Sequence, residues 1–420
     1  MIWLTIIDSH AYCTREANRY MTIQALVLEE SPVKLWGLSA RERLRRQLKE
    51  TGKVSLLDSP GELTGSGQVL LLNGRYLFEV RTLAGLINKN NAMLFCPTDS
   101  LPAAAMVDHA LVSRASAYLA GEQGSVADPN LFTRITPDDL AAFNDDLKSA
   151  QTPFLEPVTE ESKPKLENRL YGNAYKGITD LVTKFLWPRP AKKAVQLAAN
   201  LGLSPNMVTT TGLILTLAAC YFFYNGQYFA GLTAGWLMTF LDTVDGKLAR
   251  VTVQSSKFGH LYDHLIDLIH PPFWYVYWGM SLAPLTPVLG FGQEQLEWLI
   301  IIGYVGGRIV EGIFPLLGHC SIFTWRPFDA WFRLVTARRN PCLVILTISA
   351  VIGRPDWGFI AVAFWTILTT IFLVLRTLQA LVTRLRSGPL QSWLSADDVA
   401  VGPNASAYRI FGSTRGAYDA

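Results

Sequence analysis

Four aspartates lie in the stretch "LDTVDGKLARVTVQSSKFGHLYDHLID", which runs from residue 241 to residue 267. Asp242 and Asp245 are three residues apart, and Asp263 and Asp267 are four apart, so each pair lies on one face of a helix. Apolar residues precede and follow the stretch, where a carboxylate is costly and is kept for a function. Two helices joined by a short turn would aim all four carboxylates into one pocket, and that concentration of negative charge requires cations.

The other residues of the stretch agree with a site for metal ions and phosphate. Oxygen ligands without His or Cys favour Mg²⁺ or Mn²⁺ over zinc, and two such ions form a clamp for phosphoryl chemistry. Gly246 and Gly259 would let backbone or another group approach closely. Arg250 would supply a planar cation suited to phosphate, and Ser255 or Ser256 could donate hydrogen bonds to its oxygens.

The pattern D-x2-D-G-x2-A-R-x8-G-x3-D-x3-D is complete in this stretch and resembles the signature of the CDP-alcohol phosphatidyltransferases. Its eight fixed positions are Asp242, Asp245, Gly246, Ala249, Arg250, Gly259, Asp263 and Asp267. The resemblance covers roughly residues 165–385. It includes "SPNMVT" at residues 204–209, where family members carry a similar P-N-x-x-T.

This resemblance implies that a CDP-linked alcohol, usually CDP-diacylglycerol, gives its phosphatidyl group to an incoming hydroxyl and that CMP is released. It implies that two Mg²⁺ or Mn²⁺ ions are held by Asp242, Asp245, Asp263 and Asp267. Asp267 would also be the base that takes the proton from the acceptor hydroxyl. The residues implied to contact or adjoin the CDP-alcohol are Asn206, Thr209, Asp242, Gly246, Ala249, Arg250, Ser256 and Gly259. The resemblance also implies a homodimer.

Two groups of charged residues are candidates for the acceptor site. Arg308 and Glu311 lie on one face of an apolar segment, where they are either functional or a mutual ion pair. Arg333, Arg338 and Arg339 cluster ahead of the next apolar segment. They either bind a phosphorylated acceptor, such as inositol phosphate or glycerol phosphate, or only set the topology of the loop. We predict that the acceptor carries a phosphate and that these four arginines bind it.

The composition predicts a helical membrane protein. Half of the 420 residues are hydrophobic, and the net charge of +3 gives no indication of nucleic-acid binding. Six apolar segments predict six transmembrane helices, near residues 206–225, 228–245, 258–281, 296–317, 341–353 and 357–378. Pro271 and Pro272 predict a kink in the third. Arginine and lysine are concentrated in the loops on one side, so the positive-inside rule places the aspartates and both termini at the cytoplasmic face of the inner membrane.

The rest of the chain predicts a cytoplasmic α/β domain and an interfacial region. Residues 1–150 contain expected strands at 23–30 and 68–78 around an expected helix at 39–52. The first thirteen residues lack a basic region and a cleavage site, so we expect a strand there and no signal peptide. The further divisions are a linker at 151–166, basic amphipathic interfacial helices at 167–200, the six-helix domain at 201–385 and a cytoplasmic tail at 386–420.

The N-terminal domain faintly resembles sugar-phosphate nucleotidyltransferases, and some members of the phosphatidyltransferase family carry a cytidylyltransferase-type domain ahead of the membrane part. Glu29, Glu30, Ser31 and Pro32 stand where that family has a glycine-rich phosphate loop. Arg75 stands where it has a metal-binding aspartate. Acidic residues repel phosphate and an arginine cannot bind a cation, so we expect this domain to be inactive.

Three alternative functions are compatible with parts of the pattern. The roles could be reversed, with a CDP-headgroup donor and a lipid alcohol as acceptor. A divalent-cation transporter is disfavoured by Gly246, Ala249 and Arg250, and because transport sites lie near the membrane midplane and not at helix ends. A binding protein with an inactive site is disfavoured because no position of the motif is lost.

Overall fold

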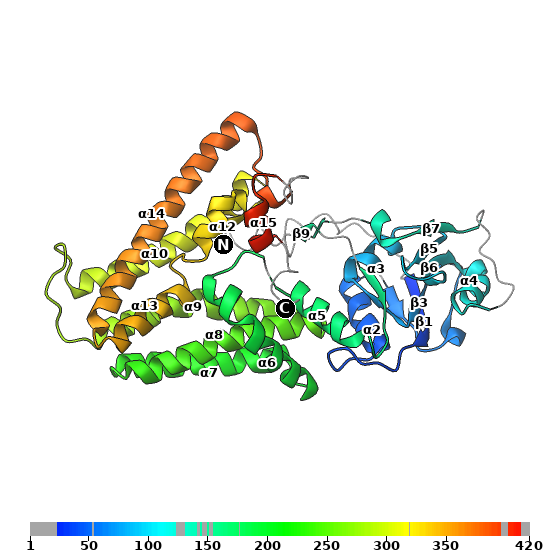
Figure 1. Ribbon diagram of the computed structural model, residues 1–420, viewed down its shortest axis with the longest axis horizontal. Coiled ribbons are helices and arrows are strands. Elements are labelled where there is room, and N and C mark those ends of the chain that lie inside the picture. The colour runs from blue at the N-terminus through cyan, green and yellow to red at the C-terminus, as the bar shows by residue number, and fades with distance from the viewer. Residues whose placement is uncertain are drawn as a thin grey trace. The chain divides into compact units, whose positions relative to one another are not determined.

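The computed structural model describes residues 23–52, 54–122, 131–140, 143–144, 149–150, 154–175, 177–318, 320–395 and 402–412 (Figure 1). The strand expected in the first thirteen residues lies outside these ranges. The chain divides into two compact units. The first consists of residues 1–34, 38–142 and 152–163, and the second of residues 35–37, 143–151 and 164–420. The boundaries predicted at residues 150 and 166 stay predictions.

The first unit is built on a six-stranded mixed sheet with the strand order β2-β1-β3-β6-β5-β7. The strands are β1 (Ile23–Glu30), β2 (Val54–Leu56), β3 (Gln68–Gly74), β5 (Ala92–Phe95), β6 (Pro102–Asp108) and β7 (Thr133–Ile135). Strand β1 is parallel to β2 and β3, and β5 is parallel to β7, whereas β6 is antiparallel to both of its neighbours. The strand at 23–30 is as predicted. The one predicted at 68–78 is divided into β3 and β4 (Tyr76–Phe78), and β4 pairs with β10 (Leu155–Pro157).

Helices cover both faces of this sheet, as the order of strands and helices predicts (Figure 1). Alternate residues of β3 point to opposite faces, so Leu70 and Leu72 join one buried cluster and Leu71 joins another. The first cluster packs against α2 (Ala40–Thr51) and α3 (Val80–Ile87), and the second against α4 (Val112–Leu119). The helix expected at residues 39–52 is present as α2, and Ser39 caps it by accepting a hydrogen bond from the backbone N–H of Glu42.

Glu29 and Arg75, two of the residues that depart from the nucleotidyltransferase pattern, lie at the carboxyl ends of β1 and β3. The Nε atom of Arg75 lies 3.0 Å from a carboxylate oxygen of Glu29, so these two charges offset each other. A side chain at Gly74 would place its Cβ 2.4 Å from the carbonyl oxygen of Glu29, so the two strands approach closely here. The arginine that stands in the place of a metal ligand is therefore held by an acidic residue of the neighbouring strand.

The second unit is helical, and a helix lies at each of the six predicted apolar segments. These helices are α7 (Pro205–Tyr224), α8 (Tyr228–Val251), α9 (Lys257–Met280), α10 (Gln293–Ile313), α13 (Arg339–Val351) and α14 (Pro355–Ser387). Three described stretches are long and apolar enough to cross a membrane: α7, α14, and α10 with the turn that continues it to Leu317. Helix α13 is short, and α8 and α9 carry the aspartates, so the count of six spans stays a prediction. Large apolar side chains such as Ile214, Ile302 and Leu375 are exposed on the three long helices, as expected beside lipid.

Shorter elements surround the six long helices. Ahead of them lie α5 (Lys163–Asn173), the π-helical turn η5 (Val182–Leu186) and α6 (Pro188–Asn200). The interfacial position expected for these elements stays a prediction. Between α10 and α13 lie α11 (Ile322–Trp325) and α12 (Pro327–Arg333). The C-terminal helix α15 (Ala405–Phe411) is packed, since Phe411 is buried in a cluster with Leu334 of the segment after α12.

Glycines bring the long helices into close contact. A Cβ at Gly231 of α8 would lie 2.4 Å from the ring of Phe223 on α7, and one at Gly279 of α9 would lie 2.3 Å from the ring of Phe359 on α14. The buried side chain of Trp274 fills the space next to Gly235. This packing holds α7, α8 and α9 in fixed positions relative to one another.

Candidate active site on helices α7, α8, α9 and α13

A tight turn at residues 252–256 joins α8 to α9. The backbone N–H of Gln254 donates to the carbonyl of Ala249 at 2.8 Å, which closes the end of α8. Val253 occupies the left-handed region with φ 49°, a conformation that is unfavourable for a β-branched residue. Ser256 begins α9 by accepting a hydrogen bond from the N–H of Gly259 at 2.9 Å. The turn therefore sets the angle at which the two aspartate-bearing helices meet.

Three of the four aspartates expected in one pocket form a group, and Asp267 is not a member of it. One carboxylate oxygen from each of Asp242, Asp245 and Asp263 lies within 4.8 Å of the others. Asp245 is buried, and the other two are partly exposed. Carboxylates this close repel one another strongly unless a cation lies among them.

The surroundings of Asp245 show that this group fits a divalent cation. Its Oδ2 accepts a hydrogen bond of 2.5 Å from the hydroxyl of Thr209 on α7, while its Oδ1 is buried without a hydrogen-bond partner among the described residues. A buried oxygen without a partner is costly, and metal coordination would satisfy it. The donor set consists of carboxylates, which Mg²⁺ and Mn²⁺ prefer. The residues present therefore fit the predicted metal site.

Asp267 and Asp242 share an arginine. The guanidinium of Arg339, at the start of α13, donates hydrogen bonds to carboxylate oxygens of both aspartates. The side chain of Arg339 is 13% exposed, whereas that of Asp267 is 35% exposed and so remains accessible to a substrate. The fourth aspartate thus lies beside the other three and is held by a cation of the chain itself.

The side chain of Asn206 on α7 lies close to Gly259 at the beginning of α9. A Cβ at Gly259 would lie 2.7 Å from Oδ1 of Asn206, so a side chain at residue 259 would displace the amide group of Asn206. The close approach expected at Gly259 is therefore present, and the group that approaches is the side chain of Asn206. Asn206 and Thr209 both come from the "PNMVT" segment that opens α7.

Three further residues expected to contact the CDP-alcohol lie along α8: Gly246, Ala249 and Arg250. The guanidinium of Arg250 donates to the carbonyls of Gly246, at 3.2 Å, and of Ala174, at 3.0 Å. A Cβ at Gly246 would lie 3.6 Å from Nη1 of Arg250, which is one turn further along α8. Ala249 contributes its carbonyl to the turn described above. The roles of these three residues and of Ser256 in binding a nucleotide stay predictions.

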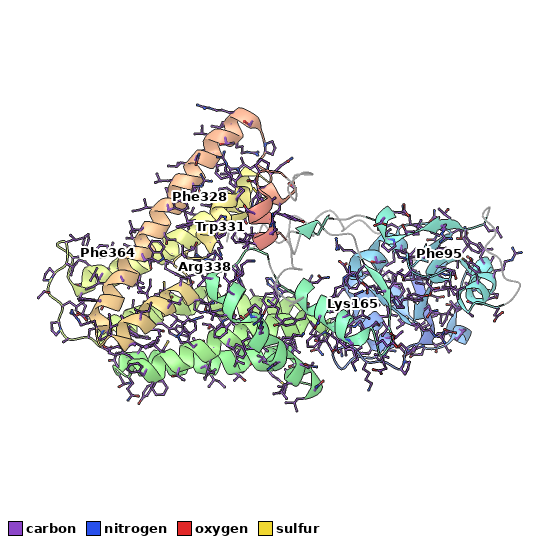
Figure 2. The ribbon with its side chains drawn as sticks, in the orientation of Figure 1. Phe95, Lys165, Phe328, Trp331, Arg338 and Phe364 are labelled. Carbon is purple, nitrogen blue, oxygen red and sulfur yellow. The ribbon has the colours of Figure 1, made fainter. Side chains whose placement is uncertain are left out.

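Three of the four predicted acceptor-site arginines form a second cluster. The carboxylate of Glu311 lies 2.6 Å from the guanidinium of Arg308 and also pairs with Arg338. Arg338, which is labelled in Figure 2, lies directly ahead of α13. The guanidinium carbons of Arg333 and Arg338 lie 5.4 and 5.7 Å from the ring centroid of Phe323. Glu311 is therefore paired with two of the three arginines, and Arg333 has no ion pair among the described residues. Even with the charge of Asp180, which interacts with Arg333, the three arginines leave one excess positive charge. The mutual ion pair considered for Arg308 and Glu311 is present, but it belongs to this larger cluster.

The charge of this cluster is incompletely compensated at Arg333. Burial and the neighbouring Arg338 lower the pKa of the Arg333 guanidinium to about 9, and its Nη1 is buried without a partner among the described residues. The guanidinium remains charged at neutral pH. An anion placed between Arg333 and Arg338 would relieve the repulsion and satisfy the unpaired donor.

Asp180 and Asn340 adjoin the cluster through the interaction of Asp180 with Arg333. The sequence analysis did not identify either residue. Asp180 accepts hydrogen bonds from the side-chain amide of Asn340 and from the N–H of Thr183, each at 3.0 Å. Burial by itself raises the pKa of Asp180, but Arg333 and these hydrogen bonds hold it below its ordinary value. An Asp just ahead of η5 is an N-cap signal, which could have indicated the local bonds but not the partner from α13.

Comparison with known proteins identifies the class to which this site belongs. Residues 202–311 match the family model of the CDP-alcohol phosphatidyltransferases, so the chain carries a domain of this membrane-embedded family of transferases. This range contains all four aspartates, Asn206, Thr209 and Arg308. The match confirms the family resemblance seen in the aspartate motif.

Two particular proteins are similar to parts of the chain. The archaetidylinositol phosphate synthase of Pyrococcus horikoshii is 41% identical over 116 residues, which are 27% of this chain and 57% of that protein. The crystal structure of the phosphatidylinositol phosphate synthase of Mycobacterium tuberculosis in apo form is 20% identical and covers 46% of this chain and 95% of that chain. Its TM-score of 0.31 is too low to carry a structural conclusion.

Proposed function

We propose that the protein transfers a phosphatidyl group from a CDP-alcohol, of the CDP-diacylglycerol type, to the hydroxyl of a phosphorylated polyol and releases CMP. The observation that carries this proposal is the carboxylate group of Asp242, Asp245 and Asp263, with the unpartnered buried oxygen of Asp245. The family to which residues 202–311 belong supports the reaction class.

The residues divide the chemistry among them. Asp242, Asp245, Asp263 and Asp267 would hold two Mg²⁺ or Mn²⁺ ions, which when bound offset the charge that develops on the transferred phosphate. Thr209 fixes the orientation of Asp245 through its 2.5 Å hydrogen bond. The side chain of Asp267 is more exposed than that of Arg339, with which it is paired, and it would take the proton from the incoming hydroxyl. Asn206, Gly246, Ala249, Arg250, Ser256 and Gly259 would bind the cytidine diphosphate part of the donor.

The arginine cluster supports a phosphorylated acceptor. Arg308, Arg333 and Arg338 present excess positive charge, and a phosphate would gain charge-assisted hydrogen bonds there. Arg339 departs from the predicted group because it faces Asp242 and Asp267, and so we assign it to the boundary between the acceptor and the aspartates. The similar protein from Pyrococcus horikoshii is named for an inositol phosphate lipid product, which favours inositol phosphate as the first acceptor to try.

The test uses the purified full chain in detergent or liposomes with CDP-diacylglycerol and Mn²⁺. The acceptor panel pairs inositol with inositol phosphate and glycerol with glycerol phosphate, and CMP release is measured. We expect release only with a phosphorylated acceptor, loss of release with excess chelator and recovery with Mg²⁺ or Mn²⁺. Full activity in excess chelator would refute the metal assignment. Release from a CDP-headgroup donor with diacylglycerol, and not from CDP-diacylglycerol, would show that donor and acceptor roles are reversed.

The N-terminal domain is proposed to lack nucleotidyltransferase activity. Arg75 is paired with Glu29 at the strand ends where a phosphate loop and a metal ligand would be needed. We expect the full chain to release no pyrophosphate from CTP and a phosphorylated alcohol. Pyrophosphate release that requires both substrates would overturn this proposal.

The membrane placement also stays a proposal beyond the three candidate spans. We place six helices across the inner membrane, with the aspartates and both termini at the cytoplasmic face, because the basic loops lie on that side. We also propose a homodimer, as the family resemblance implies. Cysteine accessibility at Arg354→Cys, on the opposite side, against Arg386→Cys, on the cytoplasmic side, tests the orientation, and cross-linking in membranes tests the dimer.

A further inference from the structure

Two consecutive prolines leave two carbonyl groups of α9 without their ordinary partners. In an α-helix, the N–H of each residue donates to the carbonyl four residues earlier, and proline has no N–H. Pro271 and Pro272 lie inside α9, which continues through them from Lys257 to Met280. The carbonyls that lose their donors are therefore those of Asp267 and Leu268. One of them belongs to the residue proposed as the catalytic base.

A tyrosine of the neighbouring helix supplies the missing donor. The hydroxyl of Tyr304, on α10, lies 3.0 Å from the carbonyl oxygen of Leu268 and 3.3 Å from that of Asp267, and donates to them. The side chain of Tyr304 is buried, with 7% of its surface exposed. A carbonyl that is shielded from water and has no partner is costly, so this hydroxyl, whose single proton is shared between the two part-buried carbonyls, partly replaces the two absent N–H groups.

The position of Tyr304 is determined by close packing of α10 on α14. A Cβ at Gly303 would lie 3.0 Å from the side chain of Thr366 and 3.1 Å from the backbone nitrogen of Ile367. The hydroxyl of Thr370 donates to the carbonyl of Gly303 at 2.5 Å. Helix α10 therefore cannot slide along α14 without losing this contact, and Tyr304 is held against α9.

Tyr304 also adjoins the arginine cluster. The guanidinium carbon of Arg308 lies 5.5 Å from the centroid of the Tyr304 ring, one helical turn along α10. The same side chain thus contacts the helix that carries Asp267 and a residue of the proposed acceptor site. A shift of Tyr304 would change the distance between the proposed base and the acceptor.

We infer that Tyr304 is a positioning residue for Asp267: it holds the backbone of α9 where Pro271 and Pro272 have interrupted its hydrogen bonds. This inference rests on the proposed function, in which Asp267 takes the proton. A catalytic group must be held within a fraction of an ångström, and small misplacements cost up to about a hundredfold in rate. The prolines make the carbonyl of Asp267 available, and the tyrosine determines where it lies.

The experiment is a rescue cycle. Tyr304→Phe removes only the hydroxyl, and we expect kcat for CMP release to fall about tenfold with the KM of the CDP-alcohol unchanged. Pro271→Ala with Pro272→Ala restores both backbone donors, so in that background Tyr304→Phe should change kcat by less than about twofold. If the double alanine variant does not fold, Pro272→Ala alone tests the shorter contact, to Leu268. Tyr228→Phe is the matched control, because it loses a 3.0 Å hydrogen bond with Ser281 at the other end of α9.

Thermal unfolding of the same variants separates this inference from the proposed function. We expect Tyr304→Phe to lower the unfolding midpoint in the wild-type background and to have little effect when the prolines are replaced. Equal losses of kcat in both backgrounds would overturn the positioning role. Equal shifts of the unfolding midpoint in both backgrounds would overturn the contact itself. If the wild-type chain releases no CMP, the proposed function and the positioning role both fail. The unfolding midpoints would still show whether the Tyr304 hydroxyl replaces the missing N–H donors of α9.

Discussion

Replacing Thr209 with valine tests whether a neighbour on another helix orients the metal-binding carboxylates. Valine has nearly the shape of threonine but no hydroxyl, so the change removes the 2.5 Å hydrogen bond to Asp245 and the 3.1 Å contact of the same hydroxyl with the carbonyl of Pro205 on its own helix. Asp245 is 3% exposed, and its other oxygen has no partner among the described residues. In the variant, both oxygens of a buried carboxylate would lack a hydrogen-bond donor.

The size of the effect follows from that single contact. A hydrogen bond to a charged group contributes about 1.5–3 kcal/mol, and about 1.4 kcal/mol corresponds to a factor of ten in an equilibrium constant. If the bond holds Asp245 in the orientation that binds the ion, the Mn²⁺ concentration for half-maximal activity should rise roughly ten- to a hundredfold. Loss of hydrogen bonds to metal-ligating groups in other proteins has effects of the same order.

The assay titrates Mn²⁺ against CMP release and, separately, against the thermal unfolding midpoint, which needs no turnover. Thr211→Val is the matched control, because the hydroxyl of Thr211 donates only to the carbonyl of Met207 on its own helix and is exposed. We expect the control to keep the wild-type Mn²⁺ dependence. Wild-type Mn²⁺ midpoints in Thr209→Val, by both measurements, would refute the role of this hydrogen bond and leave the proposed reaction itself standing.

Three further predictions concern the base, the acceptor and the effect of pH. Asp267→Asn should keep Mn²⁺-dependent thermal stabilisation while CMP release is lost, and near-normal turnover would remove Asp267 as the base. Arg338→Ala should raise the KM of the phosphorylated acceptor about tenfold or more and leave the KM of the donor unchanged, because a charge-assisted hydrogen bond of about 1.5–3 kcal/mol is lost. Arg354→Ala is its control, because this change removes only contacts with the neighbouring residues Asp356 and Trp357. Equal acceptor KM values in the two variants would show that Arg338 does not bind the acceptor. Burial lowers the pKa of Lys184 to about 8, below the ordinary lysine value of about 10.4. Between these two pH values Lys184 is protonated in the unfolded chain but has lost its proton in the folded chain. The free energy of unfolding should therefore rise with pH from about 8 to about 10.4. Lys184→Met should remove that rise in the unfolding midpoint, and an unchanged pH profile in the variant would contradict the assignment.

Local patterns predicted the features that depend on one segment of the chain. The helix at Ala40–Thr51 follows from its cap and its apolar spacing, and the aspartate pairs follow from the period of the α-helix. The short turn between α8 and α9 brings these pairs together, so the convergence of Asp242, Asp245 and Asp263 was also predictable. Each of these features involves residues that are close in sequence, where backbone geometry alone determines which side chains meet.

Neighbouring residues with the same chemistry can nevertheless have different partners, as Arg338 and Arg339 demonstrate. Arg338 precedes α13 with an extended backbone, whereas Arg339 is the first residue of the helix. Their side chains therefore leave the chain in different directions, Arg338 toward Glu311 and Arg339 toward Asp242 and Asp267. The sequence placed both in one basic group, because their charge and spacing carry no information about the direction of each side chain.

The sequence by itself indicated the family, through eight fixed positions that resemble its signature and lie within the range that its model matches, and it located the helices that carry them. Only the tertiary structure decided which residues of other helices hold the site: Thr209 on Asp245, Arg339 between two aspartates, and Tyr304 on the carbonyls that two prolines leave unpaired. The two prolines in the sequence show that two N–H donors are missing from α9. The hydroxyl that takes their place belongs to Tyr304, more than thirty positions away in the sequence. Contacts of this kind depend on how helices pack against one another, which glycines and large buried side chains determine through shape and which a local pattern does not encode.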